Sequence, residues 1–233
     1  HHLIRRIVLS ATYRQSSVTD GKSRERDPGN IYLARGSATR LSAEMIRDNA
    51  LALSGLLVHK AGGPSVKPYE VAVSFKPTSP GKGDDLYRRS VYTWWKRTGP
   101  APVMMTFNAS KRDVCRVRRE ITSSPLQAFV LLNGPQFMEA SRIMGAKLLQ
   151  KHRDSPDTLI VEAYRAFTSR LPADGEHKVL RTLYDEQLAH YQAHPDQAKG
   201  FLGIGASPAA KNLPAPQVAA AAILINAIMN LDE

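Results

Sequence analysis

The sequence predicts a mainly α-helical protein, a helical array with a small β or extended insert in the middle, at about residues 69–107. Three observations predict this class. Apolar residues recur at helical spacing in several separate segments. Prolines, glycines and capping residues stand where those segments begin and end. Between residues 69 and 107, in contrast, short segments alternate in polarity or are rich in residues that favour strands.

The segment Leu41–Leu57 predicts the first clear helix. Ser42 stands in the position of an N-cap, and Gly62 and Gly63 follow beyond the last apolar residue. The apolar residues at helical spacing are Met45, Ile46, Leu53, Leu56 and Leu57. We therefore expect residues 1–68 to form a helical and loop segment.

Residues 69–122 are predicted to form a basic insert. Tyr69–Phe75 alternates between apolar and polar residues, as a half-exposed strand does. Val91–Trp95 and Val103–Phe107 are rich in β-forming residues. Prolines and glycines between these segments indicate exposed loops. A small sheet or extended chain is expected here.

Residues 123–233 predict an array of packed helices. Ser124 and Pro125 supply a cap and a first-turn proline for the first of them. Pro216 opens a final helix through Leu231 that is apolar on nearly every side, which predicts a central, buried position. The helices expected before it span Leu126–Leu132, Gln136–Gln150, Asp157–Thr168 and Gly175–Ala193. The whole chain, 1–233, is predicted to be one domain.

Composition excludes several classes of protein. With 233 residues and 42% apolar content, the chain can bury a core and is not expected to be disordered. A single cysteine, Cys115, excludes an internal disulfide framework. The most apolar stretch, Val218–Met229, is 12 residues long. A membrane span is not predicted, because about 20 residues are needed to cross a bilayer.

Positive charge is concentrated in one part of the chain. The formal net charge is +11, and residues 88–119 hold nine basic residues against one acidic residue. Most of the bases there are arginines, whose planar guanidinium suits bidentate contact with carboxylate, phosphate or sulfate. The candidate anion-binding residues are Arg88, Arg89, Arg97, Arg112, Arg116, Arg118 and Arg119. The alternative is that these arginines pair with acidic residues and helix C-termini inside the fold.

Trp94 and Trp95 lie within the same basic segment. Their rings are candidates for stacking on a sugar ring or a base, and the alternative is ordinary packing in the core. Glu186, His190 and His194 share one face of a predicted helix, but a solvated polar face explains them better than a metal site. The common nucleotide, metalloprotease and esterase motifs are absent. No metal and no cofactor are predicted.

Six blocks of sequence, in order, carry a resemblance to a known family. The blocks are Ser10–Ser17, Leu33–Leu57, Gly62–Tyr69, Tyr87–Thr98, Met104–Ala140 and Asn230–Glu233. Their order resembles the planctomycete-type PSD domain, a domain of unknown function. That family lies at the C-terminal end of large exported proteins, which often also contain a c-type cytochrome domain. The resemblance implies a periplasmic or cell-surface location and the company of sulfatase-like and polysaccharide-utilisation proteins.

The resemblance also implies that the chain is the C-terminal portion of a larger domain, because the family's domain usually begins before Ser10. The family generally has carboxylates where Asn108 and Gly134 stand in this sequence. If those carboxylates serve an activity, this chain lacks some of them.

Two functions follow as hypotheses. The first is a non-catalytic periplasmic binding or interaction module whose arginine-rich segment binds an acidic glycan or an acidic neighbouring domain, such as the cytochrome c domain of the parent protein. The alternative is an enzyme acting on a sulfated or uronic polysaccharide, with Asp113, Glu120 or Asp85 carrying the proton. Nucleic acid binding uses the same arginines, but an exported location makes nucleic acid an unlikely partner.

Overall fold

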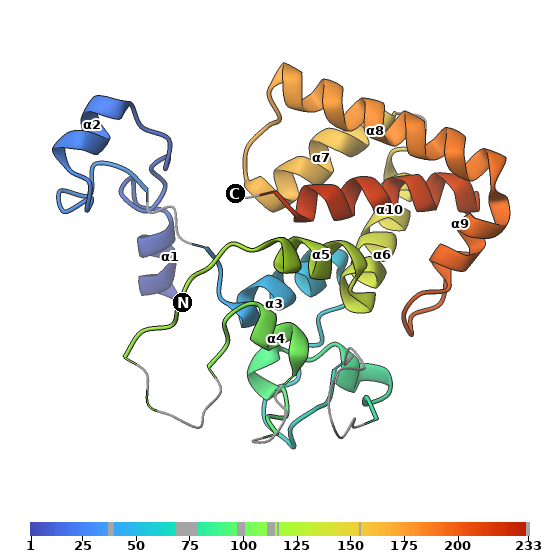
Figure 1. The fold of residues 1–233 in the computed structure, drawn as a ribbon, viewed down its shortest axis with the longest axis horizontal. Coiled ribbons are helices and arrows are strands. Elements are labelled where there is room, and N and C mark those ends of the chain that lie inside the picture. The colour runs from blue at the N-terminus through green and yellow to red at the C-terminus, as the bar shows by residue number, and fades with distance from the viewer. Residues whose placement is uncertain are drawn as a thin grey trace. The chain divides into compact units, whose positions relative to one another are not determined.

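The computed structural model describes residues 1–36, 40–68, 79–96, 101–110, 115, 117–153 and 155–231. These residues contain ten α-helices and two short 3-10 helices (Figure 1). Their β structure is limited to two isolated bridges, so the predicted mainly α class is confirmed. Among the same residues, no helix has both the length and the apolar character needed to cross a membrane. The chain divides into two compact units, residues 1–40 and 41–232.

The first unit contains two short helices, α1 (His2–Val8) and α2 (Gly21–Arg26). Helix α2 begins where the Asp20 carboxylate accepts the backbone N–H of Ser23 at 2.8 Å. This contact satisfies one of the N–H groups that a helix start leaves without a partner.

The second unit opens with helix α3 (Ala43–Ser54), as the sequence predicts. The Ser42 hydroxyl accepts the backbone N–H of Met45 at 3.3 Å, which confirms the predicted cap. The predicted end was wrong. The helix stops at Gly55, whose φ of 72° is left-handed, and so ends before Gly62 and Gly63. Gly55 adopts this conformation at little cost because it lacks a Cβ.

The predicted C-terminal helices are confirmed, with small shifts at their ends. They are α5 (Pro125–Asn133), α6 (Pro135–Lys151), α7 (Pro156–Thr168), α8 (Asp174–Ala193) and α10 (Ala215–Met229). One helix, α9 (Pro195–Leu202), was not predicted. It is only eight residues long and buries just Ala198 and Leu202, so its periodicity is too short to recognise in the sequence.

Helix α10 is the centre of this array, as its apolar sequence predicts. It packs against α6, α7, α8 and α9, and Figure 1 shows it in red beside them. The four alanines Ala219–Ala222 are fully buried. Opposite them α6 carries Gly145, where an added Cβ would lie 3.1 Å from the backbone nitrogen of Ala222. Small residues on both helices therefore let the two backbones approach closely.

The expectation of β structure at Val103–Phe107 was wrong, because this segment forms helix α4 (Pro102–Thr106) and its C-cap. Pro102 occupies the first helical position, where a missing N–H costs nothing. Val103, Met104 and Phe107 are buried in one cluster with residues of α3, α5 and α6. Burial on one helical face outweighs the strand preference of these residues.

The other described residues of the insert form single turns and irregular chain. The 3-10 helices are η1 (Gly83–Leu86) and η2 (Ser90–Tyr92). Immediately after η2, Thr93 pairs with Val66 in a parallel bridge, and a second bridge joins Val58 to Arg88. Tyr69–Phe75, the other predicted strand, lies outside the described residues.

We predict that Gly145→Val destabilises the protein by about 2 kcal/mol, because the new side chain forces α6 away from α10. Urea unfolding measures the difference in the free energy of unfolding between the variant and the parent chain. Gly175→Val is the matched control, since a Cβ at Gly175 in α8 meets no atom within 4 Å. Equal stability of the two variants would contradict the close contact between α6 and α10.

Candidate functional site

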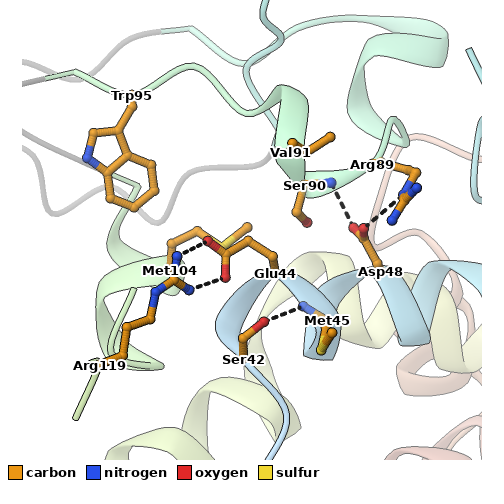
Figure 2. Close-up of a pocket in the computed structure, with 10 residues that line it drawn as sticks. All are labelled: Ser42, Glu44, Met45, Asp48, Arg89, Ser90, Val91, Trp95, Met104 and Arg119. Atoms are coloured by element: carbon orange, nitrogen blue, oxygen red, sulfur yellow. Dashed lines mark hydrogen bonds and ion pairs between the residues drawn. The ribbon is translucent and has the colours of Figure 1, made fainter. Parts of the chain in front are cut away.

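A cleft with a volume of about 400 Å³ lies beside helix α3 (Figure 2). One wall is α3 itself, and the other walls come from the segment 89–95, from α4 and from the segment that follows it. The lining residues are Ser42, Glu44, Met45, Asp48, Arg89, Ser90, Val91, Trp95, Met104 and Arg119. The cleft is therefore built from parts of the chain that are distant in sequence.

The buried guanidinium of Arg47 joins these parts. Its side chain is 2% exposed. Arg47 Nε donates to Gln136 Oε1 of α6 at 2.9 Å, and its two terminal nitrogens donate to the carbonyls of Arg88 at 2.8 Å and Leu86 at 2.6 Å. Burial lowers the pKa of Arg47 to about 10, against the opposing effect of Asp48, so the group stays charged at neutral pH. Arg47 thereby attaches both α6 and the segment 86–90 to α3.

Asp48, the next residue of α3, positions the same segment within the cleft. Its Oδ1 accepts the backbone N–H of Ser90 at 2.8 Å. Its Oδ2 lies 3.6 Å from Nε of Arg89, whose side chain is 61% exposed. As Figure 2 shows, the Arg89 guanidinium lies beside this carboxylate at one end of the cleft.

A second ion pair lies at the other end. The two terminal nitrogens of Arg119 donate to the two carboxylate oxygens of Glu44, at 2.6 Å and 3.1 Å. Partial burial favours the neutral form of Glu44, but the hydrogen bonds from Arg119 outweigh it and leave the pKa of Glu44 lowered. The same bonds raise the pKa of Arg119. This bidentate pair fastens the segment around Arg119 to α3.

Between the ion pairs, the surface is largely apolar. The Trp95 ring lies on one side in Figure 2, and Met45, Val91 and Met104 complete this part. The cleft thus combines an aromatic face, two guanidinium groups and two carboxylates. Such a set can stack on a flat apolar ring, donate paired hydrogen bonds to an anion, and accept hydrogen bonds from hydroxyl groups.

Three of the residues predicted from sequence meet in this cleft: Arg89, Arg119 and Trp95. Arg118 is exposed but does not line it. Arg97, Arg112 and Arg116 lie outside the described residues. The acidic partners of Arg89 and Arg119 are Asp48 and Glu44 of α3 rather than acids near them in the sequence.

Arg88 is a structural residue, because it is 1% exposed and its guanidinium faces backbone oxygens. It donates to the carbonyl of Pro64 at 2.9 Å, to that of Lys60 at 3.1 Å, and to that of Gly62. Its guanidinium carbon lies 4.1 Å from the centre of the Tyr92 ring. Arg88 thus holds the loop around residues 60–64, and the anion-binding prediction rests on the arginines that solvent reaches.

Trp94 and Trp95 have different surroundings although they are adjacent. Trp94 is half-buried, and Lys67 Nζ lies 4.7 Å from the centre of its ring. The backbone N–H of Trp94 donates to the carbonyl of Val66 at 2.7 Å, which places it in the bridge with that segment. Only Trp95 of the two lines the cleft.

Sequence reasoning missed Glu44 and Asp48. A signal was present, because the two carboxylates are four residues apart on a predicted helix and so share one face. Of the acids proposed as proton carriers, Asp85 and Glu120 do not line the cleft, and Asp113 lies outside the described residues. Among the described residues, the carboxylates that the fold brings to the cleft are therefore Glu44 and Asp48 rather than Asp85 or Glu120.

The described residues contain no cluster of three or more His, Cys, Asp or Glu side chains suited to a metal ion. The rings of His190 and His194 stack with their centres 4.7 Å apart. His190 Nε2 also pairs with Gln197 Oε1 at 3.0 Å.

Fold and site together define a mainly helical module with a mixed-charge cleft. Residues 1–184 match the model of the PSD1 family, described as protein of unknown function (DUF1553), and the chain belongs to this family. This confirms the resemblance drawn from the sequence blocks. Comparison with curated proteins found no match, and comparison with solved structures found none.

We predict that the stability contributed by Glu44 is lost in acid. A lowered pKa means that the carboxylate stabilises the fold above the unfolded pKa of Glu, about 4.3, and that this stability disappears as the pH falls through the folded value. Glu44→Gln should therefore unfold more easily than the parent chain at neutral pH, and the difference should shrink toward about pH 3. Urea unfolding across this range measures the effect. A difference that does not change with pH would contradict the Glu44–Arg119 pair.

Proposed function

We propose that this chain is a non-catalytic binding module that holds an anionic saccharide in the cleft beside α3. The observation that carries the proposal is the meeting of Trp95, Arg89 and Arg119 in one open cleft. A saccharide offers a ring face for the tryptophan, and a sulfate or uronate group for an arginine.

The ion pairs in the cleft are weak enough for a ligand to displace them. Exposed pairs contribute about 0–1 kcal/mol, because both charges remain partly hydrated. An incoming sulfate can therefore compete with Asp48 for Arg89, whose side chain is 61% exposed. The displaced carboxylate can then accept hydrogen bonds from sugar hydroxyls, so the pair offers both kinds of contact that a charged sugar needs.

The mixed charge of the cleft also favours a ligand with separated anionic groups. Glu44 and Asp48 repel a chain of closely spaced phosphates, whereas a sulfated or uronic saccharide can direct its anion to an arginine and its hydroxyls to a carboxylate. This argument supports an acidic glycan over nucleic acid. A periplasmic or cell-surface location belongs to the same proposal. An acidic neighbouring domain, such as a cytochrome c domain, is the competing partner.

We predict that Arg89→Gln, Arg119→Gln and Trp95→Ala each weaken binding of chondroitin sulfate by about tenfold at physiological salt. Calorimetric titration against chondroitin sulfate and neutral dextran measures this. Arg118→Gln is the matched control, since it removes the same charge from an exposed arginine that does not line the cleft. Equal losses in all three arginine variants, erased by salt, would mean nonspecific attraction of a polyanion instead.

The Glu44→Gln variant provides a second test of saccharide binding. It releases Arg119 from its internal carboxylate, so affinity for the sulfated glycan should rise a few fold, although the variant is less stable. If the Glu44–Arg119 pair were merely structural, Glu44→Gln would lower stability and leave the affinity for the glycan unchanged or reduced.

An enzyme acting on sulfated or uronic polysaccharide is the second candidate, favoured by the presence of two carboxylates on adjacent turns of α3. Acid catalysis needs a protonated carboxyl at neutral pH, whereas the pKa of Glu44 is lowered. We therefore expect no new reducing ends when the folded protein is incubated with a panel of such polysaccharides. Turnover that Glu44→Gln or Asp48→Asn abolishes would replace the binding proposal.

A further inference from the structure

The position of Arg89 in the cleft depends on the backbone that carries it. The Arg89 side chain is 61% exposed, and its Nε lies 3.6 Å from Oδ2 of Asp48 (Figure 2), which is longer than a hydrogen bond. An exposed pair at this distance contributes little to holding a flexible side chain in one place. The backbone of the segment 86–90 therefore decides where this guanidinium meets a ligand.

Helix α3 holds one part of this backbone. Arg47 donates to two of its carbonyls, and Asp48 accepts the N–H of Ser90 at 2.8 Å. All three of these contacts come from a single helix. The side chain of Tyr87, which lies between the two bound carbonyls in sequence, contacts a different part of the fold.

Tyr87 attaches the same segment to helix α6. Its phenol hydroxyl donates to Oε1 of Glu139 at 2.8 Å. Glu139 is fully buried, and burial strengthens such a hydrogen bond because little water competes for either partner. Breaking the bond would leave a buried carboxyl oxygen with one partner fewer, which is costly. The middle of the segment 86–90 is therefore tied firmly to a second helix.

The loop between α9 and α10 packs on the same carboxyl group. The backbone N–H of Ser207 donates to Glu139 Oε1 at 2.6 Å, and Ser207 Oγ lies 3.0 Å from the Tyr87 hydroxyl. A Cβ at Gly205, whose φ is 96°, would lie 2.4 Å from Cδ of Glu139. Glycine therefore lets the loop backbone approach the carboxyl group this closely.

Arg142, three residues after Glu139 on α6, holds this loop in place. Its Nε donates to the carbonyl of Ile204 at 2.8 Å, and one of its terminal nitrogens donates to the carbonyl of Ser207. The Arg142 side chain is 2% exposed, and its Nη2 lies 3.7 Å from Glu139 Oε1. The Tyr87 hydroxyl thus enters a buried polar network whose other members are fixed to α6.

We propose that Tyr87 is a positioning residue for the saccharide site. Its bond to Glu139 fixes the segment 86–90 to α6, as Arg47 fixes it to α3, so that Arg89 is in place before the ligand arrives. A site that is fixed in advance loses less conformational entropy on binding, which raises the affinity. This inference rests on the proposed function. It makes α6 and the loop before α10 determinants of affinity, although the cleft is lined by other parts of the chain.

The Tyr87→Phe variant tests the inference, because it removes one hydroxyl and keeps the ring. We expect the affinity for chondroitin sulfate, measured by calorimetric titration at physiological salt, to fall about threefold. In the Arg89→Gln background the same substitution should change the affinity no further, because the guanidinium that Tyr87 positions is gone. An equal loss in both backgrounds would mean that Tyr87 acts on the fold as a whole, and it overturns the inference.

Tyr164→Phe on α7 is the matched control. The Tyr164 hydroxyl also donates to a glutamate, at 2.8 Å from Oε1 of Glu176, and Tyr164 belongs to the main core. The control therefore loses the same kind of hydrogen bond, and it should bind chondroitin sulfate like the parent chain. A loss of affinity as large as that of Tyr87→Phe would attribute the effect to lowered stability, and it also overturns the inference.

Amide hydrogen exchange, followed by NMR, tests the positioning without a ligand. In Tyr87→Phe the Ser90 N–H, which donates to Asp48, should exchange about fivefold faster than in the parent chain, because the segment opens more often. Tyr164→Phe should leave this rate unchanged. An unchanged rate in Tyr87→Phe overturns the inference. If the parent chain does not bind chondroitin sulfate, the saccharide proposal fails, and the Ser90 exchange rate still decides whether Tyr87 holds the segment.

Discussion

The buried guanidinium of Arg47 is the interaction on which the cleft depends. A buried charge is costly unless hydrogen bonds satisfy it, and Arg47 meets this requirement by donating to a side chain of α6 and to two carbonyls of the segment 86–90. These bonds join three parts of the chain at one point. Because the segment cannot leave α3 without breaking the hydrogen bonds from Arg47 to its carbonyls, Arg89 and Ser90 are held where they line the cleft.

The same helix sets the electrostatic character of the cleft. Glu44 and Asp48 pair with Arg119 and Arg89, so the most basic part of the sequence becomes a mixed-charge surface at this site. A site of this kind discriminates by the placement of charges rather than by their sum. The first unit differs, because its bases exceed its acids.

The main core and the cleft lie in separate parts of the second unit. The main core lies among α6, α7, α8 and α10, where alanines and Gly145 allow close helix packing. The cleft lies at the edge of a smaller cluster that includes α3 and α4. Substitutions of Arg89 and Arg119 therefore act on side chains that are partly exposed, and most of the apolar burial that stabilises the fold lies elsewhere.

The sequence by itself determined helices α3, α5, α6, α7, α8 and α10, the absence of a disulfide framework and the family, because helical periodicity, caps and motif blocks are local properties. It also indicated Arg89, Arg119 and Trp95. Tertiary structure decided the surroundings of each arginine. Arg88 is buried against backbone carbonyls, and Arg119 pairs with Glu44, which lies 75 residues away in the sequence. It also turned Val103–Phe107 from expected strand into helix. Such outcomes depend on burial and on partners distant in the chain, which no local pattern records.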